Sequence, residues 1–265
     1  DAVSRMSMKN SLTLPEDETL KRLASGENYV IRIKLPRKEE VKFQDIIRGW
    51  VSVNTNNMDD KVLFKSDGMP TYHLANIVDD HLMQITHVIR GEEWLPSAPL
   101  HVLLYQMLGW EESMPVFAHL PLILRPDGNG KLSKRDGDRL GFPVFPLDWK
   151  DPISGEQSVG YRERGYFPQA FNNLLAMLGW NPGTSQEIFS MEELIEAFSL
   201  EKVGKAGSKF DPVKAKWYNQ QYLRAESNEN LAEELRPYLQ AEGYGSFDPE
   251  FVKGVCELMK ERATF

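Results

Sequence analysis

The sequence predicts an α/β fold with a parallel sheet, and three observations support this. Apolar strand patterns alternate with helical patterns between residues 61 and 124, an order typical of βαβ crossovers. The length of 265 residues and the hydrophobic fraction of 41% allow one large or two modest domains with a buried core. Helical patterns without further strands follow from residue 168. We therefore expect a strand-containing first half and a helical second half.

The N-terminal region is predicted to be β-rich. Residues 29–36 alternate apolar and polar side chains and end in a proline, and residues 46–53 and 61–65 are further short strand candidates. Asparagine and aspartate cluster between residues 54 and 60, which indicates a turn. The first 66 residues are therefore expected to form a small β-rich unit.

The central region is predicted to alternate between helices and strands. In order, the pattern indicates a helix over 71–83, a strand over 85–89, a helix over 97–108 and a strand over 117–124. Ser97 is the expected N-cap of the second helix, and Gly109 is expected to end it. Ligands of parallel sheets bind beyond the carboxyl ends of the strands, so residues after 89 and after 124 are candidate site positions.

Glycine and proline are frequent between residues 136 and 160, which predicts a long irregular connection. Helical patterns follow it, over residues 168–178, 191–198, 211–222 and from 248 onward.

Composition limits the function classes. The net charge of -8 argues against a generic polyanion binder, and the single cysteine excludes an internal disulfide framework. No apolar run approaches the roughly 18 residues of a membrane helix, and no signal-peptide pattern occurs at the N-terminus. We therefore expect a cytoplasmic protein without membrane contact.

A basic segment follows the last predicted strand. Lys131, Lys134 and Arg135 lie within the five residues KLSKR, with Arg125 upstream, in a stretch rich in Gly, Asp and Asn. Cations on a flexible loop at the carboxyl end of a strand suit the neutralisation of phosphate charge in a transition state. A solvated basic loop is the alternative, and the residues leave both open.

Two features indicate a small-molecule site. Tyr72 and Asn76 are four apart on a predicted helix, so their polar tips can converge on one ligand, or else form a core edge with a satisfied amide. Arg90 ends an apolar strand, and its guanidinium fork matches a carboxylate. The ligand could supply that carboxylate, or it could be internal, from Asp79, Asp80, Glu92 or Glu93.

A second basic stretch lies between residues 202 and 224, with six Lys or Arg against one acid. Phe210, Trp217, Tyr218 and Tyr222 interleave with these cations. Contact with a phosphate backbone and a solvated helix face are equally compatible with the pattern. The histidines and aspartates at 73–81 have spacings that scatter around a helix, so no metal site is expected.

Several separated motifs occur in a defined order. They are KSDGMPTYHLANIVDDHLMQITHVIRGEEWL at 65–95, FAHLPLIL at 117–124, KLSKR at 131–135 and GYFPQAFNNLLAMLGW at 165–180. In this order they resemble glutamyl-tRNA synthetases, class I enzymes with a Rossmann catalytic domain, over roughly residues 28–225. The resemblance implies the second half of a Rossmann-type parallel sheet, a β-rich inserted segment before it and a helical stem-contact region after it.

The resemblance implies a division into four parts. They are part of an inserted acceptor-binding domain at 1–66, the second half of the catalytic domain with KLSKR at 67–150, a helical stem-contact domain at 151–225 and the start of an anticodon-binding helical domain at 226–265.

The resemblance also implies roles for single residues. Tyr72, Asn76 and Arg90 match glutamate-binding positions. The positions that match ATP-binding residues are Glu93, Trp94, Leu132, Ser133 and Lys134. The residues expected to be catalytic are Lys131, Lys134 and Arg135, with Lys134 foremost. Glutamate, ATP with Mg²⁺ and tRNA(Glu) are the implied ligands, and a monomer is expected.

One signature of the family, His-x-Gly-His, is absent. The chain begins at Asp1 without a methionine and ends inside a predicted helix, so we expect a fragment that does not itself form glutamyl-adenylate. The parent is expected to be a glutamate-tRNA ligase. The alternatives are a glutaminyl-tRNA synthetase, a shortened paralogue of the glutamyl-queuosine type that glutamylates a modified tRNA base, and a non-catalytic tRNA-binding module.

Overall fold

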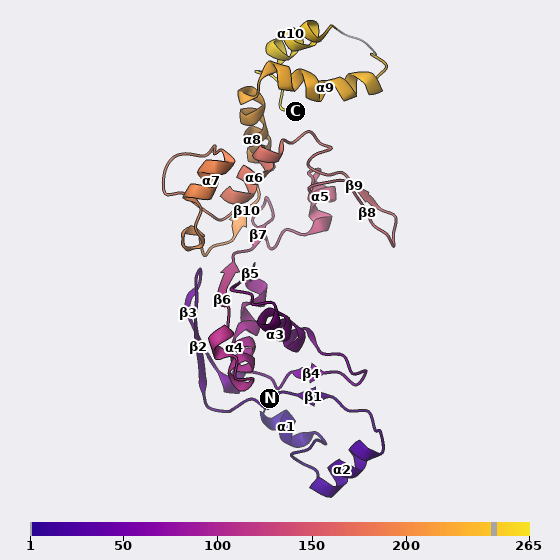
Figure 1. Cartoon of the computed structure of the whole chain (residues 1–265), viewed down its shortest axis with the longest axis vertical. Helices are drawn as coiled ribbons and strands as arrows, with labels where there is room; N and C mark the ends of the chain where they lie inside the picture. The colour runs from indigo at the N-terminus through magenta and orange to yellow at the C-terminus, as the bar shows by residue number, and fades with distance from the viewer. Residues whose placement is uncertain (1, 245–247) are drawn as a thin grey trace. The chain divides into compact units, whose positions relative to one another are not determined.

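A computed structural model describes residues 2–244 and 248–265, apart from the side chains of residues 2, 3, 134, 135 and 138. The chain forms two compact units, Asp1–Leu120 and Pro121–Phe265 (Figure 1). Within the described residues, no helix combines the length and apolar character needed to cross a membrane.

The first unit is built around a four-stranded mixed sheet in the order β3-β2-β6-β5 (Figure 1). Its strands are β2 (Glu40–Asp45), β3 (Gly49–Asn54), β5 (His87–Gly91) and β6 (Val116–Leu120). β5 and β6 pair in parallel, while β2 and β3 form an antiparallel hairpin that joins β6 at the pair Asp45–Phe117. The predicted α/β fold with parallel strands is confirmed, and the hairpin makes the sheet mixed.

One helix of the first unit covers the sheet, and a second helix packs beside it. α4 (Ala98–Met107) is buried along most of its length and packs on β2 and on α3 (Tyr72–Leu82). Its sequence APLHVLLY explains this, because burying each leucine contributes about 2 kcal/mol. Short 3₁₀ helices adjoin these elements: η1 (Thr55–Asn57), η2 (Glu92–Ser97) and η3 (Glu111–Ser113).

The remaining elements of the first unit lie before and between those of the sheet. They are α1 (Ala2–Ser7), α2 (Glu16–Ala24), and the antiparallel pair of β1 (Ile31–Arg32) and β4 (Val62–Phe64). The strand predicted over 29–36 is thus only two residues long. The strand predicted over 46–53 begins at Gly49, because residues 46–48 form the turn of the hairpin.

The second unit is mostly helical. Its helices are α5 (Lys134–Leu140), α6 (Pro168–Met177), α7 (Met191–Ala197), η4 (Leu200–Lys202), α8 (Pro212–Ala225), α9 (Asn228–Ala241) and α10 (Pro249–Met259). α6 packs on α8, and α9 packs on α10. Its strand pairs are β7 (Ile123–Leu124) with β10 (Ser208–Lys209) and β8 (Trp149–Lys150) with β9 (Gln157–Ser158).

Three expectations about these elements are wrong. Residues 117–124 are not one strand, because Pro121 has no amide hydrogen and separates β6 from β7, which belong to different sheets. Residues 136–160 are not wholly irregular, since α5, β8 and β9 fall within or overlap them. Ser97 precedes α4 but its side chain caps nothing, because the residue has helical φ and ψ at the end of η2.

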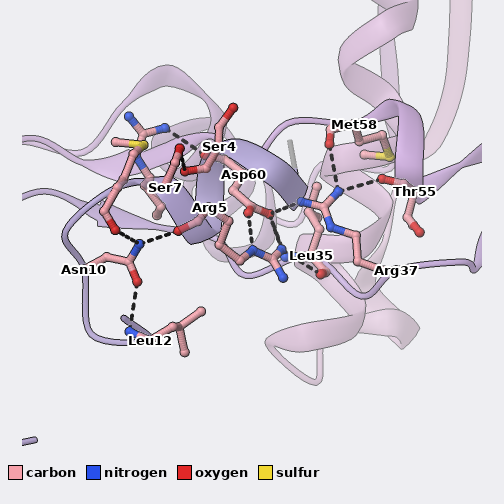
Figure 2. A network of polar contacts seen from close by, with 12 residues as sticks. Ser4, Arg5, Ser7, Asn10, Leu12, Leu35, Arg37, Thr55, Met58 and Asp60 are labelled. Carbon is pink, nitrogen blue, oxygen red and sulfur yellow. Dashed lines mark hydrogen bonds and ion pairs between the residues drawn. The ribbon is translucent and has the colours of Figure 1, made fainter. Parts of the chain in front are cut away.

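Asp60 ties the N-terminal helix to the rest of the first unit. Figure 2 shows Arg5 and Arg37 converging on its carboxylate. Arg5 Nη2 donates to Asp60 Oδ1 over 2.7 Å and to the Leu35 carbonyl over 3.0 Å, and the Leu35 amide also donates to Asp60. Burial alone would raise the pKa of Asp60, but Arg5, the Leu35 amide and Arg37 outweigh it and lower this pKa.

We predict that Asp60→Asn lowers the free energy of unfolding by about 3 kcal/mol at neutral pH, because two arginines lose their anionic partner. Because the pKa of Asp60 is lower in the folded protein, its carboxylate stabilises the fold at pH values above the ordinary aspartate pKa of about 3.9. This stabilisation is lost as the pH falls through the lower pKa of the folded state. Urea denaturation should therefore show the two proteins converging between about pH 5 and about pH 2. The variant Glu40→Gln is the control: its pair with Lys42 is exposed, so this substitution should change the free energy of unfolding far less.

Candidate functional site

Arg90 lies near the end of β5 and forms no ion pair with another described residue. Its Nε donates to Nε2 of His119 over 3.1 Å. Nη1 and Nη2 are buried and have no hydrogen-bond partner among the described residues. The Trp94 ring lies 5.9 Å from the guanidinium carbon. Buried donors of this kind favour an anion, and a carboxylate fits the geometry of the two terminal nitrogens.

His119 on β6 is held by Asp45 at the end of β2. Both side chains are fully buried, and His119 Nδ1 lies 2.6 Å from Asp45 Oδ2. Burial lowers the pKa of His119, and the Arg90 charge adds to this, although Asp45 opposes it. Burial alone would raise the pKa of Asp45, but its hydrogen bonds from Arg48, His119 and Ile47 lower it. We therefore assign a carboxylate to Asp45 and a neutral imidazole, protonated on Nδ1, to His119.

Tyr72 and Asn76 lie on α3, as predicted. The Tyr72 ring is half exposed and lies 4.8 Å from the Trp94 ring. Asn76 Nδ2 donates to Asp80 over 3.1 Å, while its Oδ1 is buried without a hydrogen-bond partner among the described residues. Burial raises the pKa of Asp80, and the charge of Arg90 opposes this rise. Trp94 thus contacts both Tyr72 and Arg90. Asp80 accepts a hydrogen bond from Asn76 and interacts electrostatically with Arg90.

Tyr105 on α4 adds a further polar group. Its hydroxyl is buried and has no hydrogen-bond partner among the described residues. Burial, with the charge of Asp80, raises the pKa of Tyr105 to about 12. The hydroxyl is therefore a neutral group that can donate one hydrogen bond and accept others.

Glu93 and Trp94 belong to η2, directly after β5. The Glu93 carboxyl lies so close to Gly91 that a Cβ at this position would overlap Glu93 Oε2. The adjacent Glu92 pairs with Arg48 at 2.9 Å. The glycine therefore allows the Glu93 side chain to fold back on the strand end that carries Arg90.

The remaining histidines have structural partners. His73 Nδ1 lies 3.1 Å from Nε2 of the buried His101, and burial, with the Arg90 charge, lowers the pKa of His101 to about 3. His81 stacks on Trp110 at 4.0 Å between ring centroids and contacts Ser113 Oγ. In the described part of the chain, no group of three or more His, Cys, Asp or Glu side chains could hold a metal ion.

The KLSKR segment lies in the second unit, where it forms a β-bridge and the start of a helix. The backbone of Lys131 forms an antiparallel β-bridge with Leu124 of β7, and the Leu132 amide donates to the Ile123 carbonyl over 2.7 Å. Ser133 then caps α5: its amide and hydroxyl both donate to Asp136, over 2.9 and 2.6 Å. The predictions for the Lys134 and Arg135 side chains lie outside the described residues.

Asp136 organises the start of α5. Arg139 donates to it over 2.8 Å, and Arg125 lies 3.6 Å away. Bonds from the Ser133 hydroxyl and amide lower the pKa of Asp136. Gly137 is required here, because a Cβ would overlap the Val144 side chain and lie 2.8 Å from the Phe142 carbonyl. Local capping and this close approach therefore fix the backbone that carries Lys134 and Arg135.

The aromatic side chains of residues 202–224 are largely structural. Phe210 and Tyr218 are core residues, and the Tyr222 hydroxyl donates to the Phe189 carbonyl over 2.6 Å. Several cations also have internal partners: Lys214 pairs with Glu187, and Arg224 pairs with Glu261. Of the four aromatic residues, Phe210 and Tyr218 are buried, Tyr222 is partly buried and Trp217 is exposed, so only part of this stretch forms a solvated face.

Sequence reasoning missed Asp45, His119 and Tyr105. A polar residue inside the apolar run FAHLPLIL is a signal that could have identified His119 as a buried, partnered group. No local pattern identifies Asp45 as its partner, because 74 residues separate the two.

The fold and these sites define a class of protein. The family of class I tRNA synthetases for glutamate and glutamine (E and Q), catalytic domain, matches residues 2–217. The chain therefore belongs to this family, and its mixed, partly parallel sheet followed by helices is the fold of that catalytic domain.

Curated relatives of high similarity carry the name of one enzyme. A glutamate-tRNA ligase of Cytophaga hutchinsonii is 63% identical over 99% of this chain and 51% of its own length. One of Amoebophilus asiaticus is 58% identical over 100% of this chain and 52% of its own length. The chain thus spans about half the length of the curated relatives that it matches.

Solved structures of glutamate-tRNA ligases also match this chain. A crystal structure of a glutamate tRNA ligase from Elizabethkingia meningosepticum, in complex with its amino acid, matches with a TM-score of 0.95 and 57% identity, over 100% of this chain and 52% of that chain. A glutamate-tRNA synthetase from Elizabethkingia anophelis matches with a TM-score of 0.94 and 57% identity, over 100% of this chain and 53% of that chain. The resemblance stated from the motifs is confirmed.

We predict that Tyr105→Phe raises the free energy of unfolding by about 1 kcal/mol, because it removes a buried hydroxyl without a partner among the described residues. Tyr222→Phe is the matched comparison and should lower it by about 1 kcal/mol, because the Phe189 carbonyl loses its donor. Calorimetric unfolding of the two variants measures both signs. Destabilisation by Tyr105→Phe would show that this hydroxyl has a partner in solution.

Proposed function

We propose that the chain is part of a glutamate-tRNA ligase, which activates glutamate with ATP and transfers it to the 3′ end of tRNA(Glu). The activity is proposed for the longer protein, since the chain spans about half the length of its relatives. The names of the relatives support the reaction class, and the amino acid bound to the Elizabethkingia meningosepticum protein supports an amino-acid site in this fold.

The observation that carries the proposal is the state of Arg90. Two buried guanidinium nitrogens without a partner among the described residues favour a carboxylate as the ligand group. Glutamate carries such a group on its side chain, whereas glutamine presents an amide whose NH₂ would face further donors. Leaving these donors unpaired disfavours glutamine, so the site favours a glutamate enzyme over a glutaminyl-tRNA synthetase.

Tyr72, Asn76 and Trp94 complete the proposed glutamate site. Asn76 Oδ1 is a buried acceptor without a donor among the described residues, and an ammonium group is a suitable partner for it. The half-exposed Tyr72 ring against Trp94 forms one apolar side of the site. Glu93, beside Trp94, is proposed to lie next to ATP.

ATP is the proposed second substrate, and KLSKR is the proposed phosphate-binding segment. Lys131, Lys134 and Arg135 provide cations for the charge that develops on the phosphates, with Leu132 and Ser133 holding the backbone between them. Mg²⁺ is proposed to accompany ATP, bound to its phosphates, which is the usual mode of binding for this ion in enzymes that use ATP.

Other features stay proposals from the sequence. They include the four-part division at residues 66, 150 and 225, a monomeric state and a cytoplasmic location. A shortened paralogue acting on a modified tRNA base would share the glutamate site but transfer to a different acceptor. A non-catalytic tRNA-binding module would show no adenylate formation at all.

We predict that Arg90→Ala in the full-length protein raises KM for glutamate by about a hundredfold, because two charge-assisted hydrogen bonds are lost. KM for ATP should change by less than about threefold. Glutamate-dependent ATP–pyrophosphate exchange with tRNA present measures both constants. Arg22→Ala, on an exposed face of α2, is the control and should leave both unchanged. An unaltered glutamate KM in Arg90→Ala would refute the assignment.

We predict that Lys134→Ala slows adenylate formation by about a hundredfold or more and leaves glutamate binding nearly unchanged, because the lysine acts on the phosphates in the transition state. Single-turnover kinetics and glutamate binding by calorimetry separate the two effects. Lys150→Ala, a lysine of the exposed β8–β9 hairpin, serves as the charge-matched control. A normal activation rate in Lys134→Ala would remove this residue from catalysis.

A further inference from the structure

We infer that His119, held by Asp45, is a positioning residue that sets the direction in which Arg90 meets the carboxylate of its ligand. The inference deepens the proposed function and rests on it, since it takes Arg90 as the residue that binds the substrate carboxylate. Neither His119 nor Asp45 touches that substrate in this role. They act through Arg90.

Three side chains form an unbroken chain of hydrogen bonds across the sheet. Asp45 on β2 accepts from His119 Nδ1 over 2.6 Å, and His119 Nε2 accepts from Arg90 Nε over 3.1 Å. Asp45 and His119 are 1% and 0% exposed, so neither can turn toward water. The position of His119 Nε2 is thereby fixed from the side opposite to Arg90.

The Arg90 nitrogen that donates to His119 determines which nitrogens remain for the ligand carboxylate. A carboxylate can approach an arginine either across Nε and one Nη or end-on across both Nη atoms. His119 uses Nε, and Nη1 and Nη2 are buried without partners among the described residues. The geometry therefore points to end-on binding across Nη1 and Nη2.

An imidazole is a suitable group for this task because it orients Arg90 without neutralising it. A carboxylate at Nε would hold the guanidinium equally well but would cancel the charge that the substrate needs. A neutral histidine accepts the Nε hydrogen and leaves the full positive charge available. Asp45 matters because it keeps the proton on Nδ1 and the lone pair on Nε2.

Asp45 is itself held by the hairpin turn. Its Oδ1 accepts from the amides of Ile47 and Arg48 over 2.9 and 2.8 Å, and Arg48 Nε donates to the His119 carbonyl over 3.0 Å. The positioning pair is therefore supported by residues 45–48, which belong to the first 66 residues that the family resemblance assigns outside the catalytic domain.

Two substitutions of His119 separate its two contacts. His119→Asn keeps a group at the Nδ1 position, which contacts Asp45, and removes the acceptor for Arg90. His119→Gln reaches the Nε2 position and keeps an acceptor for Arg90. We expect His119→Asn to raise KM for glutamate about tenfold with KM for ATP within about twofold, and His119→Gln to recover most of the loss.

Arg90→Ala distinguishes failure of this inference from failure of the proposed function. In the full-length Arg90→Ala background, His119→Asn should raise the glutamate KM no further, because the residue through which it acts is gone. If Arg90→Ala leaves the glutamate KM unchanged, the proposed function fails. If Arg90→Ala weakens glutamate use but His119→Asn does not, or if the two effects multiply independently, the positioning role is overturned.

A measurement without substitution guards against variants that do not fold. Nitrogen NMR of the ¹⁵N-histidine-labelled 265-residue chain at neutral pH reports which ring nitrogen of each histidine carries hydrogen. We expect His119 to be protonated on Nδ1 only. Protonation on Nε2, alone or together with Nδ1, would leave no acceptor for Arg90 and would overturn the inference.

Discussion

A buried carboxylate needs hydrogen-bond donors for its oxygens, and Asp45, at the end of β2, finds them on one neighbouring strand and in a turn. It accepts from the amides of Ile47, Arg48 and His119 and from the His119 ring. Leaving a buried charge unpaired costs several kcal/mol, so these contacts must form together. The same contacts close the β2–β3 turn, dock the hairpin on β6 and orient the histidine that holds Arg90.

The helices could be predicted from the sequence because their signals are local. Periodicity and a glycine with positive φ such as Gly109 mark α3, α4, α6, α7 and α8 to within a few residues, whereas α1, α2, α5 and α9 were not predicted. The strands were predicted less well. β2 was not predicted at all, although Val41 and Phe43 alternate with polar residues in it, and its parallel pairing with β6 depends on contacts that no short window contains.

The candidate site was predictable where residue type alone carried the argument. An arginine ending an apolar strand needs an anion wherever the strand lies, so Arg90 was identified. Tyr72 and Asn76 followed from helical spacing. Asp45, His119 and Tyr105 were not identified, because their importance arises from burial and from partners far along the chain. Conversely, Phe210 and Tyr218 suggested a nucleic-acid surface but fill the core, since aromatic residues near cations serve either purpose.

The separation of Asp45 from His119 along the chain has a consequence for folding kinetics. The contact between Asp45 and His119 joins residues 74 apart and so closes a long loop. Contacts of this kind form slowly, because the chain loses conformational entropy before the contact stabilises the fold. By contrast, the helices α6 and α8 of the second unit are each held by hydrogen bonds between neighbouring turns, so forming either helix closes no long loop. The orientation of Arg90 therefore depends on one of the longest-range contacts of the first unit, and nascent chains acquire a binding-competent arginine only after β6 has been synthesised and paired with β2.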